Sequence, residues 1–165
     1  SWLGKRIASE GPVKHLVLRY LAAFGPASPQ DAQNWSGLRL RQAFESLRPK
    51  LRAFRDERGR ELFDLPGAPR PPEETPAPVR FLPEFDSLLL GHADRTRVVA
   101  DEHRRAIFTP NLFNPPVFLV DGFAAGTWKF ERGKVALKPF APLPKRVRAE
   151  LDEEAAALSK FVATP

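Results

Sequence analysis

The sequence predicts an α+β protein in which a winged helix-turn-helix precedes a small antiparallel β-barrel-like unit and a C-terminal helix. Three observations predict this class. Apolar residues recur at helical spacing near the start of the chain. Seven prolines lie between Pro66 and Pro83 and interrupt regular structure. In the second half, β-branched and aromatic runs meet at an Asp121-Gly122 turn. We therefore expect a winged helix at residues 1–65, a linker or strap at 66–83, and the barrel-like unit with its helix at 84–165.

Helix and turn signals follow one another in the first part. Residues 13–24 repeat apolar side chains with a period of 3.6, and Gly25-Pro26 ends this predicted helix. Ser28 can cap a short helix over residues 29–35, and a third helix is expected from about residue 38 to 47. Residues 50–55 and 61–65 predict a hairpin that turns around Gly59. Three helices followed by a hairpin are typical of a winged helix.

The second part predicts a β-meander between helices. Short helices are expected at residues 84–90 and 102–108, and strands at 117–120, 123–130 and 134–140. Such a meander is consistent with a small barrel or a curled sheet. The last predicted helix, residues 145–162, has an apolar stripe that requires a packing partner.

Composition excludes several kinds of site. The chain has no Cys and three His, so disulfides and thiolate metal sites are excluded, and we expect no metal and no cofactor. No apolar run approaches the roughly 20 residues of a membrane span, so we expect no membrane partner and a cytoplasmic, nucleoid-associated protein. The chain contains no Met and opens SWLGKRIASE, which we interpret as a piece of a longer parent protein.

Positive charge is concentrated in one segment. The formal net charge is +6, and residues 38–60 alone hold eight basic and three acidic residues. Local basic patches are typical of nucleic-acid binding, so double-stranded DNA is the expected partner. The alternative is a solvated basic face without a nucleic-acid partner.

The candidate DNA-binding residues lie on the third predicted helix and on the hairpin. Arg and Gln make bidentate contacts to base edges, and guanidinium groups on a wing suit phosphates or the minor groove. The alternative, which Glu45 among the arginines favours, is a scaffold whose helix packs on another domain of the parent. The candidates are Arg39, Arg41, Gln42, Arg48, Arg52, Arg55, Arg58 and Arg60.

Two further sets of residues are candidates for chemistry. His92, Asp94 and Arg95 form a polar loop in which His92 could act as acid, base or phosphate ligand, and Asp94 and Arg95 could orient one another. A capped turn with an internal Asp–Arg pair is the alternative. Trp128 and Phe130 share one strand face beside Lys129 and Arg132, and either stack bases or belong to the core.

Five segments carry a resemblance to a known family. They are RYLAAFGPA from Arg19, WSGL from Trp35, LPEFDSLLLGHADRTRVV from Leu82, VDGFAAGTW from Val120 and PFAPL from Pro139. Together, over residues 16–161, they resemble the C-terminal half of the bacterial winged-helix DNA glycosylases of the AlkZ type and their uncharacterised winged-helix relatives. The resemblance implies tandem winged helices followed by a barrel-like part around a DNA channel, and removal of alkylated bases or repair of interstrand crosslinks.

The resemblance also implies what this chain lacks. The catalytic signature of such glycosylases is a Gln-x-Gln or Gln-x-Asp motif in the first winged helix, and no such motif occurs in this sequence. The resemblance therefore places the chain after the catalytic unit, with N-terminal winged helices of the parent as partners and no catalytic residue of its own. A transcription-regulator-like DNA binder and a protein-interaction scaffold remain the alternatives.

Overall fold

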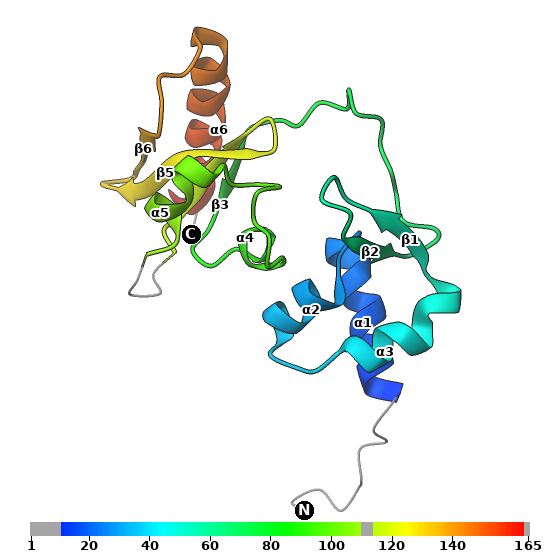
Figure 1. The fold of residues 1–165 in the computed structure, drawn as a ribbon. Helices are drawn as coiled ribbons and strands as arrows, with labels where there is room; N and C mark the ends of the chain where they lie inside the picture. The colour runs from blue at the N-terminus through cyan, green and yellow to red at the C-terminus, as the bar shows by residue number, and fades with distance from the viewer. Residues whose placement is uncertain (1–10, 110–113, 164–165) are drawn as a thin grey trace, which may run out of the picture. The chain divides into compact units, whose positions relative to one another are not determined.

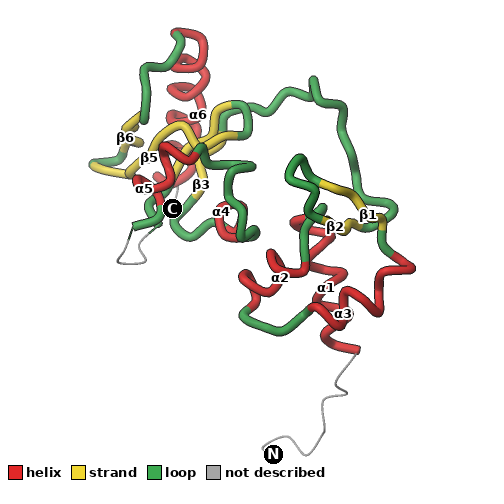
Figure 2. Tube along the Cα trace, in the orientation of Figure 1, coloured by secondary structure: helices red, strands yellow, loops and turns green. Residues whose placement is uncertain are grey.

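The computed structural model describes residues 11–109 and 114–163 and shows a mixed α+β fold (Figures 1 and 2). The opening segment SWLGKRIASE lies outside the described residues. The chain divides into two compact units: unit 1 comprises Ser1–Pro71 and Leu90–Asp94, and unit 2 comprises Pro72–Leu89 and Arg95–Pro165. Unit 1 therefore includes a five-residue loop from the second half of the sequence.

Three helices build the core of unit 1. They are α1 (Gly11–Phe24), α2 (Pro29–Ser36) and α3 (Arg41–Leu47), followed by the 3-10 turn η1 (Arg48–Lys50). Their apolar faces bury Val17, Leu21 and Phe44 almost completely. Burial of these faces stabilises helices that are too short to persist alone in water.

Helix α3 begins three residues later than the sequence predicts. Gly37 takes the left-handed conformation with φ of 70° and ends α2, and the chain becomes helical again only after Leu40. Leu40 provides no side-chain cap for α3. Instead, the Gln33 side-chain oxygen accepts from the backbone N–H groups of Leu40 (3.1 Å) and Arg41 (3.3 Å). The first turn of α3 is thus capped from α2, which spacing alone does not reveal.

The predicted hairpin is present in unit 1. Strands β1 (Arg52–Arg55) and β2 (Glu61–Asp64) pair antiparallel, with Arg55 opposite Glu61. Phe63 of β2 also exchanges two backbone hydrogen bonds with Ala27, at 2.8 and 2.9 Å. Because Phe63 is buried against Phe44, the hairpin is anchored in the helical core at its inner strand.

Unit 2 contains an open sheet where the sequence predicts a barrel-like unit. The strand order is β3-β4-β5-β6, with β3 (Arg80–Leu82), β4 (Val117–Val120), β5 (Phe123–Glu131) and β6 (Lys134–Pro139). Every pairing is antiparallel, and β3 and β6 are not paired with each other, so the described strands do not close into a barrel. The three predicted strands are confirmed. Strand β3 is additional and lies where the sequence predicts the strap.

The short helices beside this sheet are shorter than the sequence predicts. Only α4 (Ser87–Leu90) forms within residues 84–90, and residues 102–108 divide into η2 (Asp101–His103) and α5 (Arg104–Ile107). The long helix α6 (Lys145–Ala163) is present and buries Leu151 and Ala155 beside β6. Its stripe is only partly buried, since Val162 remains 50% exposed. No helix in the described part of the chain has the length and apolar character to cross a membrane.

Candidate nucleic-acid interface

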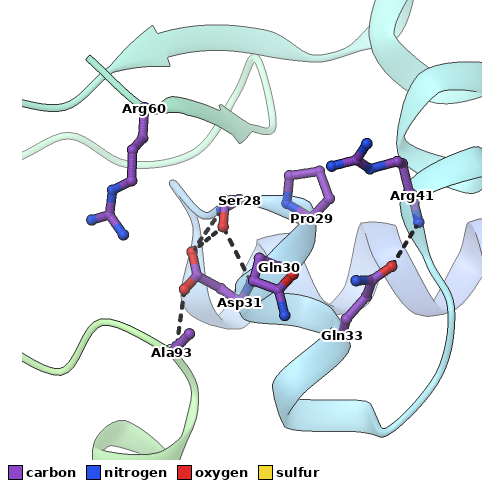
Figure 3. Close-up of a pocket in the computed structure, with 8 residues that line it drawn as sticks. All are labelled: Ser28, Pro29, Gln30, Asp31, Gln33, Arg41, Arg60 and Ala93. Carbon is purple, nitrogen blue, oxygen red and sulfur yellow. Dashed lines mark hydrogen bonds between the residues drawn. The ribbon is translucent and has the colours of Figure 1, made fainter. Parts of the chain in front are cut away.

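A recess of about 260 Å³ lies on unit 1 between α2, the start of α3 and the hairpin (Figure 3). Residues at α2, at the start of α3 and in the hairpin line the recess, and the loop Leu90–Asp94 contributes Ala93. The recess is therefore lined by two guanidinium groups, two carboxamides and one buried carboxylate. The lining residues are Ser28, Pro29, Gln30, Asp31, Gln33, Arg41, Arg60 and Ala93.

Asp31 is the buried carboxylate of the recess, and the residue is only 4% exposed. Its oxygens accept from the Ser28 backbone N–H (2.8 Å), the Ser28 hydroxyl (2.7 Å) and the Ala93 backbone N–H (2.9 Å). Burial by itself would raise the pKa of Asp31, but these hydrogen bonds, with a contribution from nearby His92, outweigh it and hold the pKa below its usual range. Asp31 thus remains an anion inside the fold.

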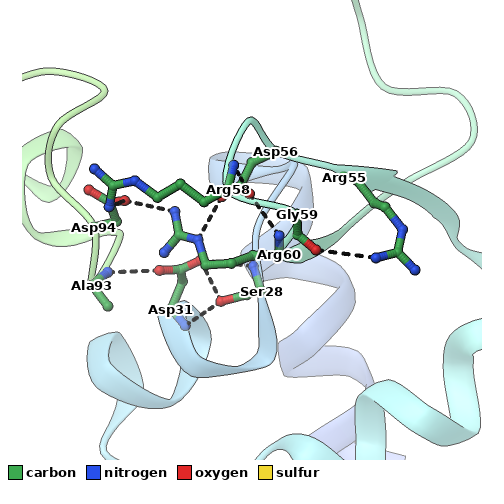
Figure 4. Close-up of polar contacts among 9 residues, drawn as sticks. All are labelled: Ser28, Asp31, Arg55, Asp56, Arg58, Gly59, Arg60, Ala93 and Asp94. Atoms are coloured by element: carbon green, nitrogen blue, oxygen red, sulfur yellow. Dashed lines mark hydrogen bonds and ion pairs between the residues drawn. The ribbon is translucent and has the colours of Figure 1, made fainter.

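The loop Leu90–Asp94 is fastened to the rest of unit 1 at each of four consecutive residues. The Tyr20 hydroxyl donates to the Gly91 carbonyl (2.6 Å), and His92 Nε2 lies 2.9 Å from the Phe24 carbonyl oxygen. Ala93 donates to Asp31, and Asp94 accepts from Arg60 (2.7 Å) and Arg58 (3.3 Å) (Figure 4). The loop is therefore an integral part of this surface.

Three of the predicted DNA-binding residues lie at the start of α3 with their side chains available. Arg39, Arg41 and Gln42 are exposed, and no side-chain hydrogen bond or ion pair engages them within the described residues. Arg41 lies at the recess, and its backbone N–H is held by Gln33 (Figure 3). This hydrogen bond fixes the backbone from which the side chains of Arg39, Arg41 and Gln42 extend.

Two other predicted residues are neutralised by carboxylates of unit 1. Arg48 forms a bidentate pair with Glu61 and lies 3.8 Å from Glu45. Arg60 donates to Asp56 (2.6 Å) as well as to Asp94, and the hydrogen bond with Asp56 is the largest of the effects that raise the pKa of Arg60. These pairs reduce the charge that the basic segment can offer to a phosphate.

The remaining hairpin arginines are more loosely held. Arg52 lies over the ring of Phe54, with 5.1 Å between the guanidinium carbon and the ring centroid, and Arg55 donates to the Gly59 carbonyl at 3.2 Å. The Arg58 side chain is 66% exposed although it reaches Asp94. Such contacts are weak at an exposed surface, so these side chains can reorient toward a ligand at little cost.

The polar loop differs from the predicted Asp–Arg turn. Asp94 pairs with Arg58 and Arg60, whereas Arg95 belongs to unit 2 and stacks on Phe108. Trp128 follows the core alternative, because it packs on Phe81 and its indole N–H donates to the Leu82 carbonyl at 2.9 Å. Phe130, by contrast, is 39% exposed and does not belong to that core.

Sequence reasoning missed Asp31 and Gln33, which hold this surface in place. A signal for Asp31 was present, because Ser28 and Asp31 have the spacing of a capping box, and both reciprocal hydrogen bonds form. Gln33 gives no such signal, since the N–H groups that it caps lie across a turn. No group of three metal-ligating side chains occurs in the two described stretches.

This chain matches known proteins over nearly its whole length. A family model described as "DNA glycosylase AlkZ-like" matches residues 1–161. An interstrand DNA cross-link repair glycosylase of Streptomyces sahachiroi is 27% identical over 170 residues, covering 95% of this chain and 44% of the relative. The solved structure of the Streptomyces sahachiroi DNA glycosylase AlkZ superposes with a TM-score of 0.75 at 26% identity, covering 95% of this chain and 45% of that one. The chain thus spans less than half the length of these relatives, and it belongs to the AlkZ-like DNA glycosylase family.

Proposed function

We propose that this chain is the DNA-binding C-terminal portion of an AlkZ-like glycosylase, and that unit 1 is a winged helix that holds duplex DNA for a catalytic unit elsewhere in the parent. The observation that carries the proposal is the group Arg39, Arg41 and Gln42, which is exposed, unpaired within the described residues and positioned by a capped helix start. The relatives supply the substrate class, since one of them is named for repair of interstrand DNA crosslinks.

The charge distribution favours contact with the phosphate backbone. Arg39, Arg41, Arg52 and Arg55 are exposed, and no carboxylate pairs with them among the described residues. Guanidinium groups in that state can replace the counterions of DNA, which gives affinity without sequence preference. At about 0.9 ions per neutralised phosphate, four contacts predict a slope of about −3 to −4 for log K against log salt concentration.

The test is the change in that slope when one unpaired guanidinium is removed. Fluorescence anisotropy of a labelled duplex, titrated with the chain at several salt concentrations, gives both affinity and slope. We expect Arg41→Gln to weaken binding to every duplex and to reduce the magnitude of the slope by about one, because one phosphate contact is lost.

The matched control removes the neighbouring ion pair without changing net charge. The double variant Arg48→Gln with Glu61→Gln replaces two side chains that already neutralise each other. We expect its slope to equal that of the parent chain. Absence of any duplex binding at low salt would contradict the proposal and favour the protein-interaction scaffold.

A regulator-like DNA binder is the second candidate, and the position of Arg41 and Gln42 favours it. These residues occupy the first turn of α3, from which a recognition helix reaches base edges in the major groove. A base-reading α3 would make Gln42→Ala cost about 1–3 kcal/mol on one preferred duplex and little on others. Equal losses across several unrelated duplexes would support the backbone-binding proposal.

A further inference from the structure

Arg95 occupies an unusual position in unit 2. Its guanidinium carbon lies 3.9 Å from the centroid of the Phe108 ring, and the residue is half-buried. The Nε atom is fully buried and has no hydrogen-bond partner among the described residues. A buried donor without an acceptor is rare in native proteins, because most such donors bind a protein group, an ordered water or an ion. The Nε–H group of Arg95 is therefore held inside the fold without an acceptor among the described residues, and only the Nη groups of this guanidinium can face a ligand.

The charge near Arg95 makes its position more unfavourable. Burial lowers the pKa of Arg95, and the like charge of Arg104 lowers it further, while no carboxylate acts in the opposite direction. Asp94, the neighbour in sequence, is engaged by Arg58 and Arg60. Two cations therefore lie within electrostatic reach of each other without a counterion in the described part of unit 2.

The backbone of both arginines is anchored in unit 2, and the side chain of Arg95 is also held. Arg95 begins a tight turn, because its carbonyl accepts from Val98 (3.0 Å) and Val99 (2.9 Å), and Val99 is buried in the core of unit 2. Arg104 begins α5, whose Ile107 is fully buried, and the Phe108 N–H donates to the Arg104 carbonyl at 2.9 Å. The Phe108 ring covers one face of the Arg95 guanidinium, so its planar edge is fixed before any ligand arrives.

We propose that Arg95 and Arg104, on the platform of Phe108, form a phosphate-binding site in unit 2 that shares no residue with the surface of unit 1. The outer edge of a fixed guanidinium, with its two Nη groups, binds two oxygens of a phosphate group, and a second cation within electrostatic reach supplies the remaining charge. The inference rests on the proposed function in taking its ligand as a backbone phosphate of DNA, although inorganic phosphate offers the same chemistry.

The first experiment uses inorganic phosphate alone. The Nε–H resonance of Arg95 and the backbone N–H resonance of Phe108, which every variant retains, are followed by ¹H–¹⁵N NMR in the intact chain while phosphate replaces chloride at constant ionic strength. We expect saturable shifts of both resonances in the parent chain. The Phe108 resonance should report about tenfold weaker binding in Arg95→Gln and Arg104→Gln, and an intermediate effect in Arg95→Lys, which keeps the charge but loses the planar edge. Arg105→Gln is the matched control, because it removes the same charge from the next residue of α5 and should leave phosphate affinity unchanged.

Thermal unfolding in chloride separates a binding role from a structural one. If the role of Arg95 is to bind a ligand, Arg95→Gln removes an unfavourable charge from the free protein. The midpoint temperature of unfolding should then stay the same or rise. A clear fall in that temperature, or a phosphate response equal in Arg95→Gln and in the parent chain, would overturn the inference.

The second experiment uses a short duplex in place of phosphate and distinguishes the two proposals. Duplex binding without any response of Arg95 would refute this site and leave the proposed function standing. Saturable binding of inorganic phosphate at Arg95 without duplex binding would support a site for a free phosphate group and refute DNA binding by this chain.

Discussion

At the scale of the residue, the carboxylates of unit 1 decide which arginines remain available. Glu61, Asp56 and Asp94 engage Arg48 and Arg60, although these arginines look equivalent to their neighbours in the sequence. The excess of positive charge in residues 38–60 is therefore smaller at the surface than a count of residues indicates. Arg39 and Arg41, at the start of α3, remain unpaired within the described structure.

Asp31 provides a stability prediction at this scale. Asp31→Asn leaves one side-chain oxygen where two now accept three hydrogen bonds, and it directs an amide N–H₂ toward an N–H donor. We expect a loss of about 1–3 kcal/mol in the free energy of unfolding at pH 7. Urea denaturation measures this loss, and Glu57→Gln, an equal charge change at an exposed position, should cost less than about 0.5 kcal/mol.

The same variant should change the pH dependence of stability. The folded-state pKa of Asp31 is lower than the unfolded value of about 3.9, so its stabilisation is complete above that value and is lost as pH falls through the folded-state pKa. We expect the parent chain to lose its advantage over Asp31→Asn below about pH 4. Denaturation midpoints measured from neutral to acidic pH test this, and a constant difference would show that ionisation of Asp31 is irrelevant.

At the scale of the element, local sequence signals predicted the kind of each element better than its limits. Helix α1, the hairpin and strands β4 to β6 follow from periodicity and turn residues. The start of α3 depends on Gln33, seven residues before Leu40, and local periodicity cannot register that contact. Strand β3 lies within a proline-rich stretch and exists because Phe81 pairs with Phe118 of β4, far away in sequence.

Gly126 of β5 illustrates how closely the sheet of unit 2 is packed. A Cβ atom there would overlap the Phe118 ring and lie 2.6 Å from the Lys138 carbonyl oxygen, so the strands on both sides require a residue without a side chain. We expect Gly126→Ala to reduce the free energy of unfolding by roughly 1–3 kcal/mol, as overpacking does elsewhere. Gly67→Ala, at which a Cβ meets nothing within 4 Å, should be nearly neutral in the same urea titration.

At the scale of the whole molecule, the sequence predicted a mixed α+β fold and membership of the glycosylase family. It did not predict that the sheet stays open, because closure depends on whether the edge strands β3 and β6 meet, and alternation of apolar residues is the same in both cases. The candidate site was predicted in part. The basic pattern of the sequence identifies Arg39, Arg41 and Gln42. It does not reveal the pairing of Asp94 with Arg58 and Arg60, because that pairing joins segments more than 30 residues apart.

A prediction for the whole chain concerns catalysis. No Gln-x-Gln or Gln-x-Asp motif occurs in the sequence, so we expect the purified chain to release no alkylated base from damaged duplex DNA above the spontaneous rate. Chromatography of the released bases measures this rate. Excision that a substitution within the chain abolishes would show that the catalytic group lies here, and would refute the proposed division of roles.

Because Leu90–Asp94 belongs to unit 1, proteolysis of the proline-rich stretch should leave this loop bound to the rest of unit 1. The backbone leaves unit 1 after Pro71, returns at Leu90 and leaves again after Asp94. The chain therefore crosses between the two units three times. A protease that cleaves the exposed proline-rich stretch would produce two fragments, and the larger would still place Gly91, Ala93 and Asp94 on Tyr20, Asp31 and Arg60. The nicked protein should therefore migrate as one species until it is denatured, and a fragment ending at Pro71 should lack part of its own surface.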